Sequence, residues 1–239
     1  IYAAARKIFV ISRFVAGRLE GFGVPTSKMQ LVYPAVDPDK FKPLARLSGP
    51  AELCRNDGDR VILSVSRLVE RKGQDQVLRA LSLVLKTVPE ARYWIAGTGP
   101  MRQSLENLVK ELCLDDKVRF LGRVGDDQLV HLYNQCDVFV MPSKECEDSG
   151  HVEGFGIVFL EANACGKPVR GGRSGGMPEA IEEGKTGFLV DPEDTKALVD
   201  ALVNVLMDAQ LAGEMGFAGR QRVLERFNWS ATLQSMDVN

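Results

Sequence analysis

Short apolar segments rich in β-branched residues alternate with segments of helical periodicity through most of this 239-residue chain. Apolar strands of this kind are typical of a sheet covered on both faces. Strand–helix alternation repeated five times predicts an α/β fold with a doubly wound parallel sheet. The expected strands are Val61–Ser66, Ala91–Ala96, Val118–Leu121, Val138–Met141, Pro168–Arg170 and Gly187–Val190. The expected helices are Gln74–Thr87, Met101–Leu112, Asp126–Gln135, Gly156–Cys165, Met177–Ile181, Asp194–Leu206 and Glu214–Arg226, with a last short helix led by Trp229.

The first 41 residues differ from this pattern. Two strand-like segments, Lys7–Ser12 and Met29–Tyr33, flank one helical segment, Arg13–Phe22. We interpret this unit as the last βαβ unit of a preceding domain, in a chain that is a fragment of something longer. The predicted division is 1–41 as the remnant of that domain, 42–60 as a linker rich in Pro, Gly and charge, and 61–239 as the main domain.

Composition excludes several classes of function. A net charge of −2, without Lys/Arg blocks, argues against a nucleic-acid-binding surface. No apolar run approaches the ~20 residues that span a bilayer, and no secretory signal is visible. The five cysteines are scattered and, with only two histidines, predict neither a disulfide framework nor a metal site. A cytoplasmic location is therefore expected.

Ligands of open α/β sheets bind at the carboxyl ends of the strands. In this chain the rule selects the loops 67–73, 97–100, 122–125, 142–156 and 171–177.

One of these loops leads into a segment with two carboxylates, Glu153 and Glu161, eight residues apart. A glycine-bracketed turn and an apolar helix start lie between them. Bare N–H groups at a helix start bind phosphate, and carboxylates accept hydrogen bonds from sugar hydroxyls. The segment could therefore hold both ends of a nucleotide sugar, although a buried apolar helix with a solvated Glu at each end is an equal alternative on composition alone.

Two cations, Arg67 and Lys72, lie in the loop after the first strand of the main domain. They suit a diphosphate, with Arg as a bidentate fork and Lys as a point charge. A solvated charged turn is the ordinary alternative, but the position of these two residues at the carboxyl ends of the strands favours a ligand-binding role.

Two glycine-containing loops and one histidine lie at the same edge. Gly97-Thr98-Gly99-Pro100 permits close backbone approach to a ligand, with an ordinary tight turn as an equal alternative. In the glycine-dense segment 171–179 free N–H groups could bind phosphate or sugar, with a flexible loop as an equal alternative. His151 is a weaker candidate ligand contact, two residues before Glu153.

Taken together, these residues resemble the donor-binding half of the family 4 glycosyltransferases, retaining enzymes of the GT-B fold with Rossmann-like domains. The likeness covers nearly the whole chain. The matching pieces are Ser66-Arg67-Leu68 with Arg71-Lys72-Gly73, Ala96 to Pro100, Phe120 to Val124, Asp137 to Ser143, the E-x7-E pattern Glu153 to Glu161, Ala164 to Val169, Gly175 to Glu179, Gly184 to Val190, and Pro34 to Asp37 with Phe41.

The resemblance implies a role for each site residue. In that family, residues corresponding to Arg67 and Lys72 bind the donor diphosphate. Glu153 would contact the transferred sugar and Glu161 the ribose hydroxyls. The remaining expected donor contacts are the backbone at Gly154, Phe155, Gly156 and Ile157, and base contacts near Gly97, Gly99, Arg123 and Val124.

The resemblance also implies what the protein needs. A nucleotide sugar is the expected donor substrate, either GDP-mannose, as in the similar phosphatidylinositol mannosyltransferases, or a UDP-sugar. No cofactor and no metal are expected. The acceptor, a glycan or a lipid, would bind the missing N-terminal domain, which could also place the protein at the inner face of the membrane.

The chain departs from the family pattern in two ways. Arg170 occupies a strand position that is usually aliphatic, and either lies at the strand's open end facing ligand or marks a locally unusual strand. The family's active-site histidine, which lies in the acceptor domain, has no counterpart.

Other functions remain as alternatives. A nucleotide-sugar epimerase of GT-B-like fold does not account for the E-x7-E pattern together with Arg67 and Lys72. The intact motifs argue against a non-catalytic nucleotide-sugar-binding subunit, which stays an alternative. An NAD-dependent dehydrogenase is disfavoured because the loop after Val61–Ser66 lacks G-x-G-x-x-G.

Overall fold

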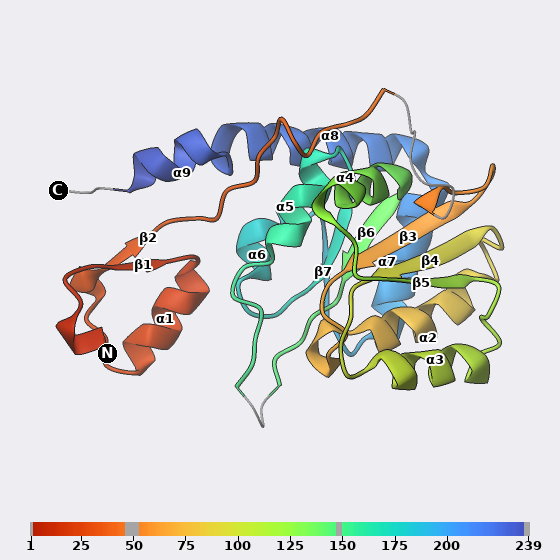
Figure 1. The fold of residues 1–239 in the computed structure, drawn as a ribbon, viewed down its shortest axis with the longest axis horizontal. Coiled ribbons are helices and arrows are strands. Elements are labelled where there is room, and N and C mark those ends of the chain that lie inside the picture. Colours follow the sequence, from red (N-terminus) through yellow and green to blue (C-terminus); the bar gives the residue numbers. More distant parts are fainter. Residues whose placement is uncertain (1, 46–52, 147–149, 237–239) are drawn as a thin grey trace.

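The computed structural model describes residues 2–45, 53–146 and 150–236. Its main domain is built on a parallel sheet of six strands in the order β5-β4-β3-β6-β7-β8 (Figure 1). The order reverses direction after β3, as it does in a doubly wound sheet. The predicted fold class is therefore confirmed. The strands are β3 (Arg60–Val65), β4 (Ala91–Ala96), β5 (Val118–Gly122), β6 (Val138–Met141), β7 (Val169–Gly172) and β8 (Gly187–Val190).

Helices cover both faces of this sheet (Figure 1). Successive strand residues point to opposite faces, so Ile62 joins one core while Val61 and Leu63 join the other. One face packs against α2 (Gln74–Val84), α3 (Arg102–Glu111) and α7 (Thr195–Met207). The opposite face packs against α4 (Asp126–Gln135), α5 (Ile157–Ala164), α6 (Met177–Ala180) and α8 (Ala209–Arg226).

The N-terminal unit forms its own small parallel sheet. It contains η1 (Tyr2–Ala4), β1 (Ile8–Val10), α1 (Arg13–Gly21), η2 (Thr26–Lys28) and β2 (Met29–Leu31). The last helix, α9 (Trp229–Ser235), runs back along the chain leaving this unit (Figure 1). Thr232 Oγ1 donates to the carbonyl of Tyr33 at 3.0 Å, and Gln30 Nε2 donates to that of Ser235 at 2.6 Å. These bonds tie α9 to the segment around β2.

The predicted linker is only partly described, because residues 46–52 lie outside the described ranges. The described part packs on the main domain. Leu53 is buried, and Arg55 forms an ion pair with Asp137 at 2.9 Å. The division into 1–41, 42–60 and 61–239 stays a prediction.

The predicted helix Glu214–Arg226 begins five residues too late. In the structure α8 starts at Ala209, and the Asp208 carboxylate caps it by accepting from the Leu211 N–H at 2.9 Å. Glycines in this stretch disfavour a helix locally. Gly216, however, lies so close to the backbone carbonyl of Gly166 that a Cβ atom would clash at 2.0 Å. Tertiary packing against the turn after α5 thus outweighs local propensity. No helix in the described part of the chain is long and apolar enough to cross a bilayer.

Candidate functional site: a cationic cluster at the carboxyl edge of the sheet

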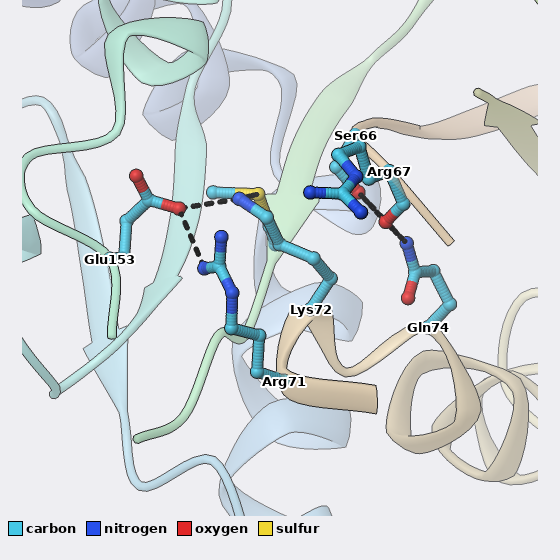
Figure 2. Close-up of polar contacts among 7 residues, drawn as sticks. Ser66, Arg67, Arg71, Lys72, Gln74 and Glu153 are labelled. Carbon is cyan, nitrogen blue, oxygen red and sulfur yellow. Dashed lines mark hydrogen bonds and ion pairs between the residues drawn. The ribbon is translucent and has the colours of Figure 1, made fainter. Parts of the chain in front are cut away.

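A short helical turn, η4 (Glu70–Lys72), follows β3 and places two basic side chains against one carboxylate (Figure 2). The Lys72 ammonium contacts Oε2 of Glu153, and Arg71 Nη1 lies 3.3 Å from the same oxygen. Glu153 belongs to the loop between β6 and α5. The structure thus brings the predicted residues Lys72 and Glu153 together, and adds Arg71, which sequence reasoning missed as a site residue.

Lys72 is buried although it is charged. Its ammonium also lies 3.3 Å from Sδ of Met141, at the end of β6. Burial lowers the pKa of Lys72, the Glu153 carboxylate opposes that shift, and the positive charges of Arg71 and Arg67 lower the pKa further. Three cations therefore act at this edge of the sheet, with Glu153 as the carboxylate that contacts two of them.

Arg67 is positioned through its backbone. Gln74, at the start of α2, donates through Nε2 to Ser66 Oγ at 2.8 Å and to the Arg67 carbonyl at 3.1 Å (Figure 2). This pair of hydrogen bonds holds the end of β3 against the first turn of α2. The Arg67 side chain is exposed, so it is available to a ligand.

A hollow of about 290 Å³ lies beside Arg67, at the carboxyl ends of β3, β4 and β5. The predicted base-contacting residues Gly97, Arg123 and Val124 line it together with Arg67. Gly99 does not line it. A Cβ atom on Gly99 would lie 2.3 Å from the carbonyl of Leu68, so its smallness serves the packing of two neighbouring loops.

The glycine-dense loop after β7 supports the backbone of Glu153. The Gly176 N–H donates to the carbonyl of Glu153 at 2.9 Å. A Cβ atom on Gly175 would meet the same carbonyl at 2.2 Å. Packing against the backbone of Glu153 therefore accounts for both glycines.

The Cβ direction of Gly154 and the ring of Phe155 both point toward the N-terminal unit. The Cα of Gly154 lies under Ile11 and Val15, so a Cβ there would approach Ile11 Cδ1 at 3.1 Å. The Phe155 ring is buried, with its centroid 5.6 Å from that of Tyr33 and 5.8 Å from that of Phe227. These two residues can therefore serve a ligand only through their backbone.

Helix α5 begins immediately after this turn. Gly156 is its N-cap, with a φ of 90° that favours glycine, and Ile157 is its exposed first residue. The N–H groups that begin a helix lack intrahelical acceptors, so they and the positive end of the helix dipole favour an anion at this place.

Glu161 lies further along α5, where Tyr133 Oη donates to its carboxylate at 2.6 Å. Burial raises the pKa of Glu161, while the Tyr133 hydrogen bond and the charge of Lys40 oppose that shift. The carboxylate therefore occupies a poorly solvated place, where hydrogen-bond donors from a ligand would stabilise its charged form.

Arg170 and His151 lie apart from these groups. Of the two alternatives for Arg170, the position at the open end of its strand facing a ligand is wrong, because its side chain is fully buried under α7 and α8. Its polar partners are carbonyl oxygens, those of Ala201 at 3.1 Å and Val169 at 2.9 Å. His151 is exposed, and its carbonyl accepts a hydrogen bond from the Cys146 N–H at 3.0 Å. In the described ranges, no group of three or more metal-ligating side chains is gathered in one place.

The chain is similar in sequence to known proteins. Residues 50–222 match the family model described as glycosyl transferases group 1. Over 220 residues the chain is 37% identical to the GDP-mannose-dependent alpha-(1-6)-phosphatidylinositol monomannoside mannosyltransferase of Mycolicibacterium smegmatis, covering 92% of this chain and 58% of that protein. It is 34% identical over 219 residues to the D-inositol 3-phosphate glycosyltransferase of Saccharomonospora viridis, covering 87% and 48%.

Solved structures show the same fold. Sucrose-phosphate synthase from Thermosynechococcus elongatus superimposes with a TM-score of 0.83 at 29% identity, over 98% of this chain and 58% of that one. The HepE protein of Anabaena, solved in complex with UDP-glucose, gives a TM-score of 0.82 at 23% identity over 96% and 62%. The chain thus spans only about half the length of the relatives it matches. It belongs to the group 1 family of glycosyl transferases and has the fold of the donor half of a GT-B enzyme.

Proposed function

We propose that this chain is the donor-binding half of a retaining glycosyltransferase that uses a nucleoside-diphosphate sugar. The observation that supports this most directly is that Arg71 and Lys72 both pair with the carboxylate of Glu153, while the charge of Arg67 also acts on Lys72. The cluster has a surplus of positive charge at the edge of the sheet where ligands of this fold bind. A diphosphate would supply the missing negative charge.

The surrounding groups suit the other parts of such a donor. The hollow lined by Gly97, Arg123 and Val124 lies beside Arg67 and would take the base. Glu161 would accept hydrogen bonds from the ribose hydroxyls, and Glu153 from a hydroxyl of the transferred sugar. The helix end at Gly156 and Ile157 would face the diphosphate or the sugar.

In this proposal catalysis is electrostatic and needs no metal. Negative charge grows on the diphosphate as the glycosidic bond breaks. Arg67, Lys72 and the N-terminal end of α5 stabilise that charge where it develops, which lowers the barrier. The carboxylate of Glu153 orients the sugar relative to Arg67 and Lys72.

The donor we propose is GDP-mannose, with a UDP-sugar as the second candidate. The first choice rests on the mannosyltransferase relative, and the second on the UDP-glucose complex of the neighbouring fold. The family match favours glycosyl transfer over the epimerase alternative. The acceptor, a lipid or a glycan, would bind a part of the protein outside this chain.

A thermal-shift screen of this chain against GDP, UDP and ADP, and against the sugar conjugate of each, tests the proposal. A ligand at 100 times its dissociation constant should add about 2.7 kcal/mol to the free energy of unfolding. The chain should bind one diphosphate and its sugar conjugate without transferring sugar to added lipid or glycan acceptors. Absence of stabilisation by every nucleotide would contradict the proposal.

A further inference from the structure

Lys72 and Arg71 share one acceptor. Both side chains leave η4 and point to the same oxygen, Oε2 of Glu153 (Figure 2). The side chains of Arg71 and Glu153 are only 22% and 17% exposed. The Arg71 backbone is also held, because its carbonyl accepts a hydrogen bond from the Lys144 N–H at 2.9 Å, which ties η4 to the loop after β6.

This arrangement poses a problem when a diphosphate binds. The Lys72 ammonium is engaged by Glu153, so it must turn at least partly from the carboxylate to reach a phosphate oxygen. Glu153 would then be a poorly solvated anion that has lost one cation and faces a new anion. A buried carboxylate without a partner is strongly destabilising.

Arg71 is placed to solve this problem. Its guanidinium has several N–H donors in a rigid fork, and Nη1 already lies 3.3 Å from Oε2 of Glu153. It can keep the carboxylate in place while Lys72 turns to the ligand. The charged groups that act on Lys72 are the cations Arg67 and Arg71 and the anion Glu153. Once Lys72 has moved to the diphosphate, Glu153 is still paired with Arg71, and the diphosphate is paired with Lys72 and Arg67.

We propose that Arg71 is a positioning residue that holds Glu153 when Lys72 transfers from that carboxylate to the donor diphosphate. The proposal rests on the proposed function, because it takes the diphosphate as the ligand of Lys72. In this view Arg71 acts on the donor through Glu153 and makes no direct bond to phosphate.

A double-mutant cycle separates this role from direct phosphate binding. Arg71→Met is made in the wild-type chain and in Glu153→Gln, and each protein is titrated calorimetrically with GDP or UDP, whichever binds the wild type more tightly. In the wild-type background the substitution should weaken binding roughly tenfold, because the carboxylate is left unpaired in the complex. In the Glu153→Gln background the loss should be less than about threefold, because the charge that needs a partner is gone.

Two further variants control for fold and charge. Arg71→Lys keeps a cation near the carboxylate and should restore most of the affinity. Arg92→Met removes a comparable Arg–carboxylate ion pair at the amino end of β4, away from the site. There Arg92 lies 3.3 Å from Asp59, with 24% of its side chain exposed. It should leave nucleotide affinity unchanged even if it lowers thermal stability.

The other outcomes overturn the proposal. Equal losses in both backgrounds would make Arg71 a direct phosphate ligand, and no loss in either would make its contact with Glu153 incidental. An equal loss of affinity for the free nucleoside would assign Arg71 to folding. Failure of the wild-type chain to bind any nucleoside diphosphate would instead contradict the proposed function. The titration of the wild-type chain alone detects that failure.

Discussion

The carboxylate of Glu153 and the ammonium of Lys72 form an ion pair across 81 residues of sequence. Each has a proposed partner on the donor, the sugar for Glu153 and the diphosphate for Lys72. Without a ligand the two groups neutralise each other, which stabilises a site that would otherwise bury an unpaired cation. Donor binding must therefore exchange one set of charge pairs for another.

The first prediction concerns Glu153→Gln. The substitution removes the anion that competes with phosphate for Lys72, so affinity for the plain diphosphate should rise about three- to tenfold, or ~0.7–1.4 kcal/mol. Affinity for the nucleotide sugar should fall relative to the diphosphate, because a hydroxyl loses its charged acceptor. Calorimetric titration with both ligands measures the ratio. A fall in diphosphate affinity as large as the fall in donor affinity would show that Glu153 does not act on the sugar.

The second prediction concerns Lys72→Ala. Losing the ammonium should weaken diphosphate binding by about 1.5–3 kcal/mol, the range for hydrogen bonds to charged groups. The matching free nucleoside, which has no phosphate, should bind nearly as well as it does to the wild type. The two titrations on one protein preparation provide the comparison. Equal losses for nucleoside and diphosphate would mean that Lys72 acts through the fold.

The third prediction is a pH dependence that originates at Glu161. Burial holds the pKa of this carboxyl above its ordinary value of 4.5. In the proposed role its charged form accepts the ribose hydroxyls, so affinity should be full above that raised pKa and should fall as the pH drops through it. Guanosine and uridine are the proper ligands, because no phosphate titrates in this range. Glu161→Gln should bind both more weakly and without this pH dependence, and a variant that keeps the same profile would place its origin elsewhere.

The fourth prediction concerns Glu179, at the end of α6. Its carboxylate accepts hydrogen bonds from the backbone N–H groups of Arg13 at 2.9 Å and Phe14 at 3.0 Å. A residue of the main domain therefore caps α1, which belongs to the N-terminal unit. Glu179→Ala should destabilise the start of α1 by about 0.5–2 kcal/mol, the usual range for a lost helix cap.

Hydrogen exchange followed by mass spectrometry measures this effect locally. Peptides from α1 should exchange faster in Glu179→Ala, whereas peptides from β3 and β4 should keep their protection and provide the internal control. Uniformly faster exchange in both regions would show that Glu179 supports the whole fold and not this contact.

The fifth prediction concerns Arg170, whose buried guanidinium is held by carbonyl oxygens and whose Nη2 has no hydrogen-bond partner. Its burial lowers its pKa to about 9. Arg170→Met should be neutral or stabilising by up to about 4 kcal/mol, because a hydrophobic side chain avoids the cost of the buried charge. Arg170→Ala should be destabilising, because it leaves a cavity. Urea unfolding measures both, and a large loss in Arg170→Met would reveal that the carbonyl contacts outweigh desolvation.

The sequence by itself determined the sheet and the elements around it. Period-2 and period-3.6 patterns lie within single segments, so β4, β6 and α4 have the predicted bounds, and alternation implies parallel strands. The carboxyl-edge rule then selected the loops that contain Arg67, Lys72 and Glu153. The roles of these residues came from the family resemblance and remain predictions.

Only the tertiary structure decided which side chains meet. Nothing near Arg71 in the sequence indicates a carboxylate 82 residues away, and nothing near Phe155 indicates that its ring packs on Tyr33 and Phe227. Arg170 occupies the core, although its charge suggested a position at the open end of the strand. The physical reason is that local patterns depend on neighbours within a few residues, whereas burial and charge pairing depend on segments that only the folded sheet brings together.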